Sequence, residues 1–415
     1  MATYRELFGV REYRYLYAGQ LLSYLGDQLG AVAIAVLVFD RTGSGLLTAV
    51  AYAASWLPGV FGGPVTATFA DRLPRRRVLV VCDLARAVLV ALLAVPAMPL
   101  PAAIVLLYVA HLWSPPFVAA RSALMPEVLA GDAYILGNGL ANVTFQVCQV
   151  VGFAVGGVVV AVIGPAPALL FNATTFGVSA LLVVVGVRSR PAPRAEPHGL
   201  WADFRAGTRY LMSDPWLRAC LLLVWAASAF SFAVEGVAYP LAVELGGGPR
   251  EAGVLLAASG IGFAVGAVVF TRVLSPARRD RLLSSAAVLS VAVLVPIVLV
   301  PTAVLVGVLL VAMGFGASFA APLNAIFVRR VAPAYRGRAM GVASSGLLAV
   351  QGLGFLVAGA VVDAGVAPTT VVGCSGAVGT LAVLAAVMYR RSVDTRLSDD
   401  TVPAGSPVAV TAPAD

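Results

Sequence analysis

The stretch ATFADRLPRRR, residues 67–77, places an aspartate and four arginines between two long apolar runs, residues 45–70 and 78–98. A helix needs about twenty apolar residues to cross the ~30 Å hydrocarbon core of a bilayer. Each flanking run has that length, whereas the charges between them belong in water. The same alternation repeats along all 415 residues and predicts an α-helical membrane protein with many spans.

The composition agrees with that prediction. Hydrophobic residues make up 60% of the chain and charged residues 12%, against roughly 25% charged residues in soluble domains. All 28 basic residues are arginines, and the formal net charge of +8 fits either nucleic acid or an anionic membrane surface. The four cysteines stand alone in separate apolar segments, so we interpret them as small buried side chains and expect no metal site.

The apolar runs predict an all-α membrane protein with twelve transmembrane helices. We expect the spans at residues 13–38, 45–70, 78–98, 101–122, 137–163, 166–187, 216–243, 251–274, 282–300, 303–328, 337–362 and 367–389.

The arginines gather in every second loop and at both ends of the chain. The opposite loops hold only Arg41 and Arg250. Because cytoplasmic loops carry the excess of basic residues, both termini are expected in the cytoplasm. The charge is thus a topology signal, which argues against nucleic acid as a partner. The exclusive use of arginine, with abundant alanine, valine and glycine, suggests a GC-rich bacterium, so we expect the bacterial cytoplasmic membrane.

The longest polar segment divides the chain into two halves. A weak repeat in glycine spacing, at an offset of about two hundred residues, relates these halves as parallel repeats with a site between them. We predict a cytoplasmic N-terminus at 1–12, six-helix bundles at 13–187 and 216–389, an interbundle linker at 188–215 and a disordered cytoplasmic tail at 390–415. Part of the linker, WADFRAGTRYLMSD, is expected to form an interfacial helix.

The charged stretch quoted first resembles the signature GxLADRxGRR of the first cytoplasmic hairpin in the major facilitator superfamily, with alanine and proline replacing its glycines. This resemblance implies the major facilitator fold, in which two pseudo-symmetric six-helix bundles carry a solute across the membrane. It also implies a cytoplasmic latch in which Asp71, Arg72, Arg75 and Arg76 contact the other half. A charged loop that only sets the topology is the simpler alternative.

Further motifs resemble a bacterial drug/proton antiporter subgroup, that of the macrolide efflux pumps and the enterobactin exporter. They are LLSYLGDQ, DLARA, RSALMP and RGR, which begin at residues 21, 83, 121 and 336. Asp83 and Arg86 are expected near the inner end of the third span, where they can pair with each other, with Asp71 or with Arg121. Arg336 and Arg338 occupy the matching loop of the second half, which implies a related closing or structural role.

Glycines of the fifth span form a further motif. Gly139 precedes GFAVGG, which holds Gly152, Gly156 and Gly157 and is similar to the GPxxGG element of drug/proton antiporters, with phenylalanine in place of proline. The resemblance implies a gating hinge specific to antiporters. Close packing of two helices on small residues is the alternative.

Three ionisable side chains lie well inside predicted spans: Asp27, His111 and Glu235. Burying such a group costs ~2.5–3.5 kcal/mol on insertion scales, so each is a functional candidate. In the major facilitator fold these spans line the central cavity. We expect Asp27 and Glu235 to exchange protons as access alternates, with Glu235 favoured as the coupling site. Asp27 as a structural hydrogen-bond acceptor, and His111 as a satisfied polar or pore-lining residue, are the alternatives.

Polar and aromatic side chains near these charges are candidates for a broad, mainly apolar pocket that binds a bulky amphipathic molecule. Ordinary helix packing is the alternative for the aromatic members. The candidates are Gln20, Tyr24, Gln28, Trp113, Phe117, Asn142, Gln146, Trp225, Phe232 and Tyr239.

The leading hypothesis is proton-driven export of a lipophilic drug, antibiotic or natural product by alternating access, through a monomer in the lipid bilayer. No GxxxxGK[ST] motif is present, so the proton gradient is the expected energy source and no cofactor is predicted. Proton-coupled uptake of a small organic solute would use the same fold and stays open. A polytopic membrane enzyme would need clustered histidines or carboxylates at one interface, which three isolated groups do not supply.

Overall fold

The computed structural model describes residues 3–54, 73–190, 200–299 and 302–399, and within these ranges the chain forms helices and no strands. The helices before residue 187 are α1 (Tyr4–Gly9), α2 (Arg11–Thr42), α3 (Gly45–Ala54), α5 (Arg75–Leu93), α6 (Leu100–Leu112), α7 (Ser114–Val128), α8 (Asp132–Ile163) and α9 (Pro165–Gly186). Those that follow are α10 (Leu200–Ser213), α11 (Pro215–Ser231), α12 (Ala233–Gly236), α13 (Ala238–Glu244), α14 (Pro249–Val268), the π-helix η1 (Val269–Val273), α15 (Pro276–Ala292), the 3-10 helix η2 (Val295–Val298), α16 (Ala303–Ala317), α17 (Ala320–Arg330), the 3-10 helix η3 (Pro333–Tyr335), α18 (Arg336–Asp363) and α19 (Pro368–Asp399).

Ten helical segments in the described ranges are long and apolar enough to cross a membrane. They correspond to the predicted spans apart from the second and third, which overlap α3 and α5. The described helix α3 has only 10 residues, and α5 begins with three arginines and also holds Asp83 and Arg86. The many apolar helices are therefore confirmed, while the count of twelve and the cytoplasmic termini stay predictions.

Local sequence signals explain where several helices begin and end. The α11 helix starts at Pro215. Proline suits the first helical position because a backbone N–H there would have no acceptor within the helix, so nothing is lost when proline lacks it. The preceding Asp214 accepts hydrogen bonds from the backbone N–H groups of Trp216 and Leu217, at 2.8 and 3.1 Å. At its C-terminus, α2 ends at Thr42 and is capped by Gly43, which has a φ of +63° that glycine adopts without strain.

The linker and the tail contain more helix than a loop would. The predicted interfacial helix of the linker corresponds to α10, Leu200–Ser213. At the other end of the chain α19 continues to Asp399, so the first part of the predicted disordered tail is helical. The charges after residue 389 did not end this helix because alternating arginine and aspartate are compatible with an exposed helix, as the Arg390–Asp394 pair at 3.8 Å shows.

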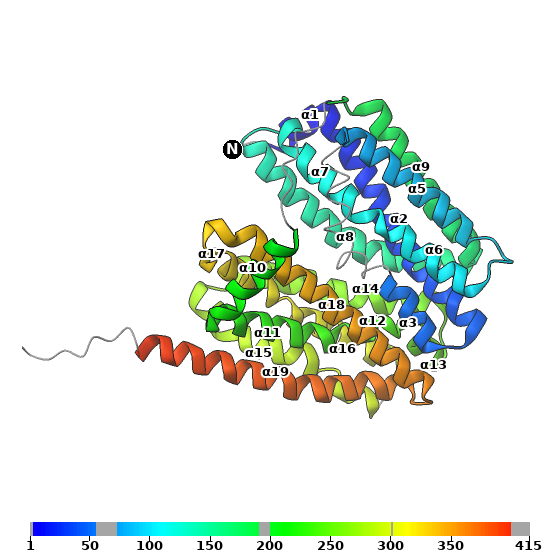
Figure 1. Cartoon of the computed structure of the whole chain (residues 1–415). Helices are drawn as coiled ribbons and strands as arrows, with labels where there is room; N and C mark the ends of the chain where they lie inside the picture. Colours follow the sequence, from blue (N-terminus) through cyan, green and yellow to red (C-terminus); the bar gives the residue numbers. More distant parts are fainter. Residues whose placement is uncertain (1–2, 55–72, 191–199, 300–301, 400–415) are drawn as a thin grey trace, which may run out of the picture.

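The helices form two groups (Figure 1). We call α1 to α9 the first group and α11 to α19 the second group. Within the first, α2 packs on α8 and α9, and within the second, α11 packs on α18 and α19; α8 contacts α14, and α3 contacts α18, across the two groups. Glycines allow this close approach, since a Cβ on Gly157 would lie 2.9 Å from the Gly253 Cα, and a Cβ on Gly359 2.9 Å from the Leu46 Cα.

Hydrogen bonds join the two groups at the end of the molecule where α2 finishes, which we call the Asp40 end. Asp363 of α18 accepts hydrogen bonds from the Ser44 hydroxyl at 2.6 Å and from the Leu46 N–H at 3.1 Å. The Tyr239 hydroxyl donates to Asp40 at 2.9 Å. Farther from this end, residues of α8 and α14 line a cavity between the two groups. The described structure is thus closed at the Asp40 end and leaves space between the groups farther along.

Candidate functional site

Glu235 lies in a segment where the helix is interrupted twice. The segment forms α11, α12 and α13 in succession, with Phe232 and Val237 at the breaks. Glu235 is buried, with 7% of its surface exposed. The Tyr52 hydroxyl of α3 donates a hydrogen bond to its Oε2 atom at 2.9 Å. Because Tyr52 belongs to the first group and Glu235 to the second, this bond joins the groups inside the apolar interior.

The walls around this bond are largely apolar. Phe355 of α18 contacts Tyr52 edge-on, with ring centroids 5.1 Å apart, and a Cβ on Gly236 would lie 2.8 Å from Phe355. Two cavities of about 10 Å³ that Glu235 lines have room for about one water molecule each. Within the described part of the chain, no basic side chain forms an ion pair with Glu235. This carboxyl group can therefore change its protonation state without leaving a cation unpaired.

Asp27 has a different environment, inside the first group. Its Oδ1 atom lies 2.5 Å from Nη2 of Arg86, which comes from α5. The guanidinium group stacks on the Phe176 ring of α9, 4.0 Å from the ring centroid, and its side chain is only 5% exposed. A buried guanidinium needs such a counter-charge, because an unpaired charge in an apolar interior is costly. The Asp27 carboxylate, itself 30% exposed, thus supplies the counter-charge of a buried arginine.

Two further predicted residues lie next to this ion pair. His111 of α6 lines the same small cavity as Asp27 and Arg86, about 10 Å³ in volume, and its buried Nε2 atom has no hydrogen-bond partner among the residues that the structure describes. Asp83 precedes Arg86 by one turn and is fully buried, yet Arg86 pairs with Asp27. Asp27 and His111 therefore line one small cavity and Glu235 lines others. The sequence had predicted that all three residues lie on helices around one central cavity.

Arg121 was expected near the end of a span, next to a basic loop. The structure corrects this, because α7 continues to Val128 and keeps Arg121 inside the helix. Its guanidinium group donates a hydrogen bond to Oε1 of Gln20 in α2. Gln20 is 2% exposed, so this predicted cavity residue instead joins two helices of the first group. The sequence prediction ended this span at residue 122 because the hydropathy falls at Arg121. The helix itself continues to Val128.

Three of the predicted pocket residues line cavities large enough for a small molecule, and Tyr239 lines one of the small cavities beside Glu235. Asn142 and Gln146 line a cavity of about 560 Å³ between α8 and α14. Trp225 lines a second cavity, of about 320 Å³, inside the second group, and its indole N–H donates to the Ala343 carbonyl at 3.2 Å. Both volumes are in the range that small-molecule sites occupy.

The remaining pocket candidates take part in packing. Phe117 is 8% exposed and belongs with Trp113 to an apolar core of the first group. Tyr24 contacts Phe145 edge-on, with ring centroids 5.2 Å apart. At the Asp40 end, Phe232 packs beside Tyr52, and Tyr239 forms the hydrogen bond to Asp40 described above; Gln28 lies against Gly152.

The glycines of α8 face different neighbours. A Cβ on Gly152 would lie 2.7 Å from the Gln28 Cβ, and one on Gly156 would lie 3.0 Å from the Leu29 Cα, so both glycines allow α8 to approach α2. Gly157 faces α14 of the second group instead. Gly139 has no atom within 4 Å of an added Cβ, so close packing does not require glycine at that position.

The predicted latch is described only in part, because Asp71 and Arg72 lie outside the described residues. Arg75 pairs with Glu127 and donates to the Ala123 carbonyl at 2.8 Å, both in α7, and Arg76 donates to the Val184 carbonyl of α9. These arginines contact the first group to which they belong, whereas the latch was expected to reach the other half. Their partners within the described residues therefore stabilise one bundle.

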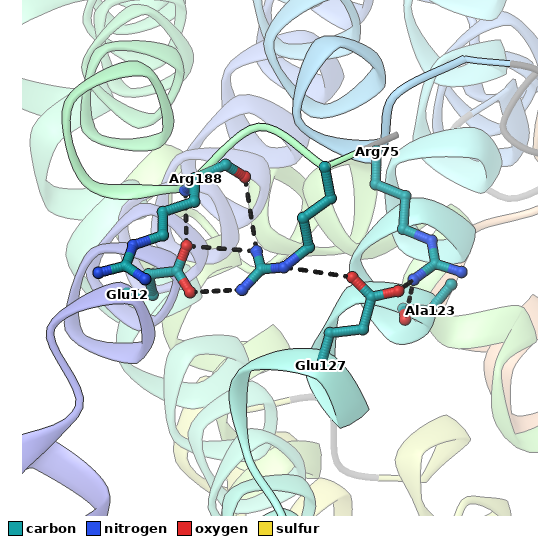
Figure 2. A network of polar contacts seen from close by, with 6 residues as sticks. Glu12, Arg75, Ala123, Glu127 and Arg188 are labelled. Carbon is teal, nitrogen blue, oxygen red and sulfur yellow. Dashed lines mark hydrogen bonds and ion pairs between the residues drawn. The ribbon is translucent and has the colours of Figure 1, made fainter. Parts of the chain in front are cut away.

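A network of charges extends this arrangement (Figure 2). Arg190, just after α9, lies 2.7 Å from Oε2 of Glu12 and 3.4 Å from Oε2 of Glu127, while the Arg188 N–H donates to Oε1 of Glu12 at 2.5 Å. The sequence interpretation missed Glu12, Glu127 and Arg190, although acidic residues beside arginine-rich loops were an available signal. The network joins the start of the linker to the ends of α2, α5 and α7.

The matching arginines of the second half have local contacts. Nε of Arg336 donates to the Val331 carbonyl at 3.3 Å, and the Arg338 guanidinium lies 5.9 Å from the centroid of the Tyr335 ring. A Cβ on Gly207 of α10 would lie 2.8 Å from the Arg338 carbonyl oxygen, so α10 packs closely on the start of α18.

Comparisons with known proteins agree on one class. The profile of a family described as transmembrane secretion effector matches residues 7–408. The multidrug efflux pump Tap of Mycobacterium tuberculosis is 28% identical over 360 residues, which cover 83% of this chain and 85% of the pump. Tap of Mycolicibacterium fortuitum is also 28% identical, over 357 residues, with 82% and 86% coverage.

Solved structures with similar folds are transporters as well. A bacterial homologue of the human lysosomal transporter Spinster, in an inward-facing and unoccupied conformation, superposes with a TM-score of 0.68 at 15% identity, over 95% of this chain and 99% of that one. The POT family transporter PepTSo gives a TM-score of 0.72 at 13% identity, over 93% and 99% of the two chains. At these identities the likeness concerns the fold.

Proposed function

Since the chain belongs to the transmembrane secretion effector family of major facilitator transporters, we propose that it exports a lipophilic or amphipathic compound in exchange for protons. The relatives that carry a functional name are multidrug efflux pumps, which supports export over uptake. The substrate would bind in a mainly apolar cavity between the two groups of helices. On this proposal the chain is a transporter of the bacterial cytoplasmic membrane and not an enzyme.

The single observation that carries the proton coupling is the Tyr52–Glu235 hydrogen bond. It connects the two groups, which must separate at the Asp40 end for a substrate to leave on that side, and its acceptor is a carboxylate. An ionised carboxylate accepts a stronger hydrogen bond than a neutral carboxyl group does. Binding a proton at Glu235 therefore weakens one of the contacts that hold the Asp40 end closed.

The proposed topology gives this cycle a direction. If twelve spans place both termini in the cytoplasm, the Asp40 end faces outward, because α2 begins near the N-terminus and crosses once. The described conformation is then the one that is closed toward the outside. A proton arriving from outside and a substrate arriving from inside would reach the same interface in alternation.

Transport in everted membrane vesicles tests the proposal. In such vesicles the inner face of the membrane points outward, so an exporter accumulates its substrate when a proton gradient is applied. We expect proton-dependent accumulation of lipophilic dyes, and its loss when a protonophore collapses the gradient. Proton-dependent accumulation in intact cells, with none in everted vesicles, would support uptake and contradict export.

A further inference from the structure

The two groups of helices leave a crevice between α8 and α14, farther from the Asp40 end than their glycine contact at Gly157. Its volume is about 560 Å³. Valines on both helices form its outer rim, and they are 54% exposed at Val147 and 51% exposed at Val265. In a membrane protein such exposed apolar rows face hydrocarbon, so the α8–α14 crevice opens toward lipid.

The crevice adjoins a second cavity inside the second group, which we call the inner cavity. Its volume is about 320 Å³, and it lies among α11, α14, α17 and α18. Phe263 of α14 lines both spaces. Only this side chain is common to their walls within the described residues, so Phe263 stands between the lipid-facing crevice and the inner cavity.

The two spaces are lined by few polar groups, and all of these groups are uncharged. No charged side chain lines either space within the described part of the chain. Asn142 and Gln146 offer amide groups on the α8 wall of the crevice, and Asn324 and Ser344 offer neutral polar groups in the inner cavity. A charged solute would pass without any counter-charge, whereas an uncharged molecule with a few hydrogen-bonding groups meets matching partners.

We propose that the α8–α14 crevice is a lateral access path through which an uncharged, lipophilic substrate passes from the membrane into the inner cavity, with Phe263 as the residue that separates the two. The proposal rests on the function proposed above for its substrate, and it deepens that function by assigning the substrate class and its route. The occupant is the transported molecule, drawn from the lipid phase in which it concentrates.

Photolabelling with adamantyl diazirine tests the path without requiring transport. This small apolar carbene precursor partitions into lipid and reacts with the side chains it reaches. In proteoliposomes we expect labels on the crevice residues and also on Trp225, Asn324 and Met340 of the inner cavity. In the double variant Val147→Trp Val265→Trp, which fills the crevice, labelling of the inner cavity should fall at least fivefold.

Matched controls separate this effect from general damage. Val158 of α8 and Val254 of α14 are 45% and 51% exposed and do not line the crevice. The double variant Val158→Trp Val254→Trp therefore adds the same bulk to the same helices and should label as wild type does. Gel filtration of both variants checks that each one folds.

Several results would overturn the path. Inner-cavity labelling that is absent from wild type, or equal in wild type and the crevice variant, would show that the crevice does not lead inward. Phospholipid retained by wild type in native mass spectrometry and lost in the crevice variant, with unchanged inner labelling, would make the crevice a lipid site. Expected labelling together with no export of any lipophilic dye would leave the path intact and contradict the proposed function instead.

Discussion

Asp27 and Glu235 are both carboxyl groups in apolar helices, but the structure surrounds them differently. Asp27 is paired with Arg86 inside the first group, whereas Glu235 accepts a hydrogen bond from a phenol that belongs to the other group. The first arrangement is internal to one bundle and does not depend on how the groups meet. The second exists only while the groups are closed at the Asp40 end. Burial alone therefore does not distinguish the two carboxyl groups, and our proposal for Glu235 rests on its position at a contact that must open.

The largest expected effect is the loss of coupling on Glu235→Gln. The amide has the same shape and its oxygen can still accept the Tyr52 hydroxyl, but it cannot exchange a proton. We expect proton-dependent accumulation in everted vesicles to fall at least 100-fold, with folding unchanged in thermal denaturation. The control is Asp280→Asn, which neutralises a carboxylate that is 58% exposed on α15. Wild-type coupling in Glu235→Gln would move the coupling role to another group.

Asp27→Asn should act on stability instead of coupling. It leaves the Arg86 guanidinium buried without a counter-charge, and breaking a buried pair in this way costs about 3 kcal/mol. The double variant Asp27→Asn Arg86→Met should recover most of that loss, because no unpaired charge remains. Unfolding in detergent followed by circular dichroism measures both. If Asp27→Asn is fully stable but uncoupled, the assignment of the two carboxyl groups must be exchanged.

These two environments show what the sequence could predict. The apolar spans were predictable because hydrocarbon thickness fixes their length, and Asp27, His111 and Glu235 were visible as charges within them. The partner of Arg86 was not predictable. Asp83 is nearer in sequence, but the rotation of each helix about its axis is set by packing, which a uniformly apolar sequence does not specify.

The partner of Tyr52 could not be predicted from the sequence either. It is one tyrosine in the run AVAYAAS, and nothing in that run indicates that its hydroxyl reaches a carboxylate 183 positions away. Likewise, α7 continues past Arg121 to Val128, and the partner of the Arg121 guanidinium is the Gln20 amide oxygen, about one hundred positions earlier in the chain. Long-range partners of this kind follow from the assembled bundle and have no local signature.

A smaller effect is expected for Tyr52→Phe, which removes the hydrogen bond and keeps the ring that packs on Phe355. A hydrogen bond to a charged group contributes about 1.5 kcal/mol, which corresponds to roughly a tenfold change in an equilibrium. We expect the groups to open more often at the Asp40 end. Thr48 of α3 is 1% exposed, so Thr48→Cys in a Cys374→Ser background reports opening through its reaction with an impermeant maleimide.

The control for that variant is Tyr108→Phe, since Tyr108 packs in the first group and its hydroxyl has no hydrogen bond within the described residues. Maleimide labelling should rise about tenfold in Tyr52→Phe and remain at the wild-type rate in Tyr108→Phe. Equal rates in all three proteins would mean that the Tyr52–Glu235 bond does not hold the Asp40 end closed.

The smallest effect is expected where charges meet water. The Arg190–Glu12 pair at the end of the first group has side chains that are 25% and 14% exposed, whereas Arg86 is 5% and its partner Asp27 30% exposed, so the two pairs differ in the burial of the arginine. Salt screens partly exposed charges much more than buried ones. Arg190→Gln should therefore lower stability by less than about 1 kcal/mol, and the difference from wild type should vanish in 1 M salt. The loss caused by Asp27→Asn should persist at that salt concentration, because its origin is an unpaired charge that ions cannot approach. A salt-insensitive loss in Arg190→Gln would mean that ions cannot approach the charges around Glu12 any more than they approach Arg86, and the contrast between the two sites would no longer hold.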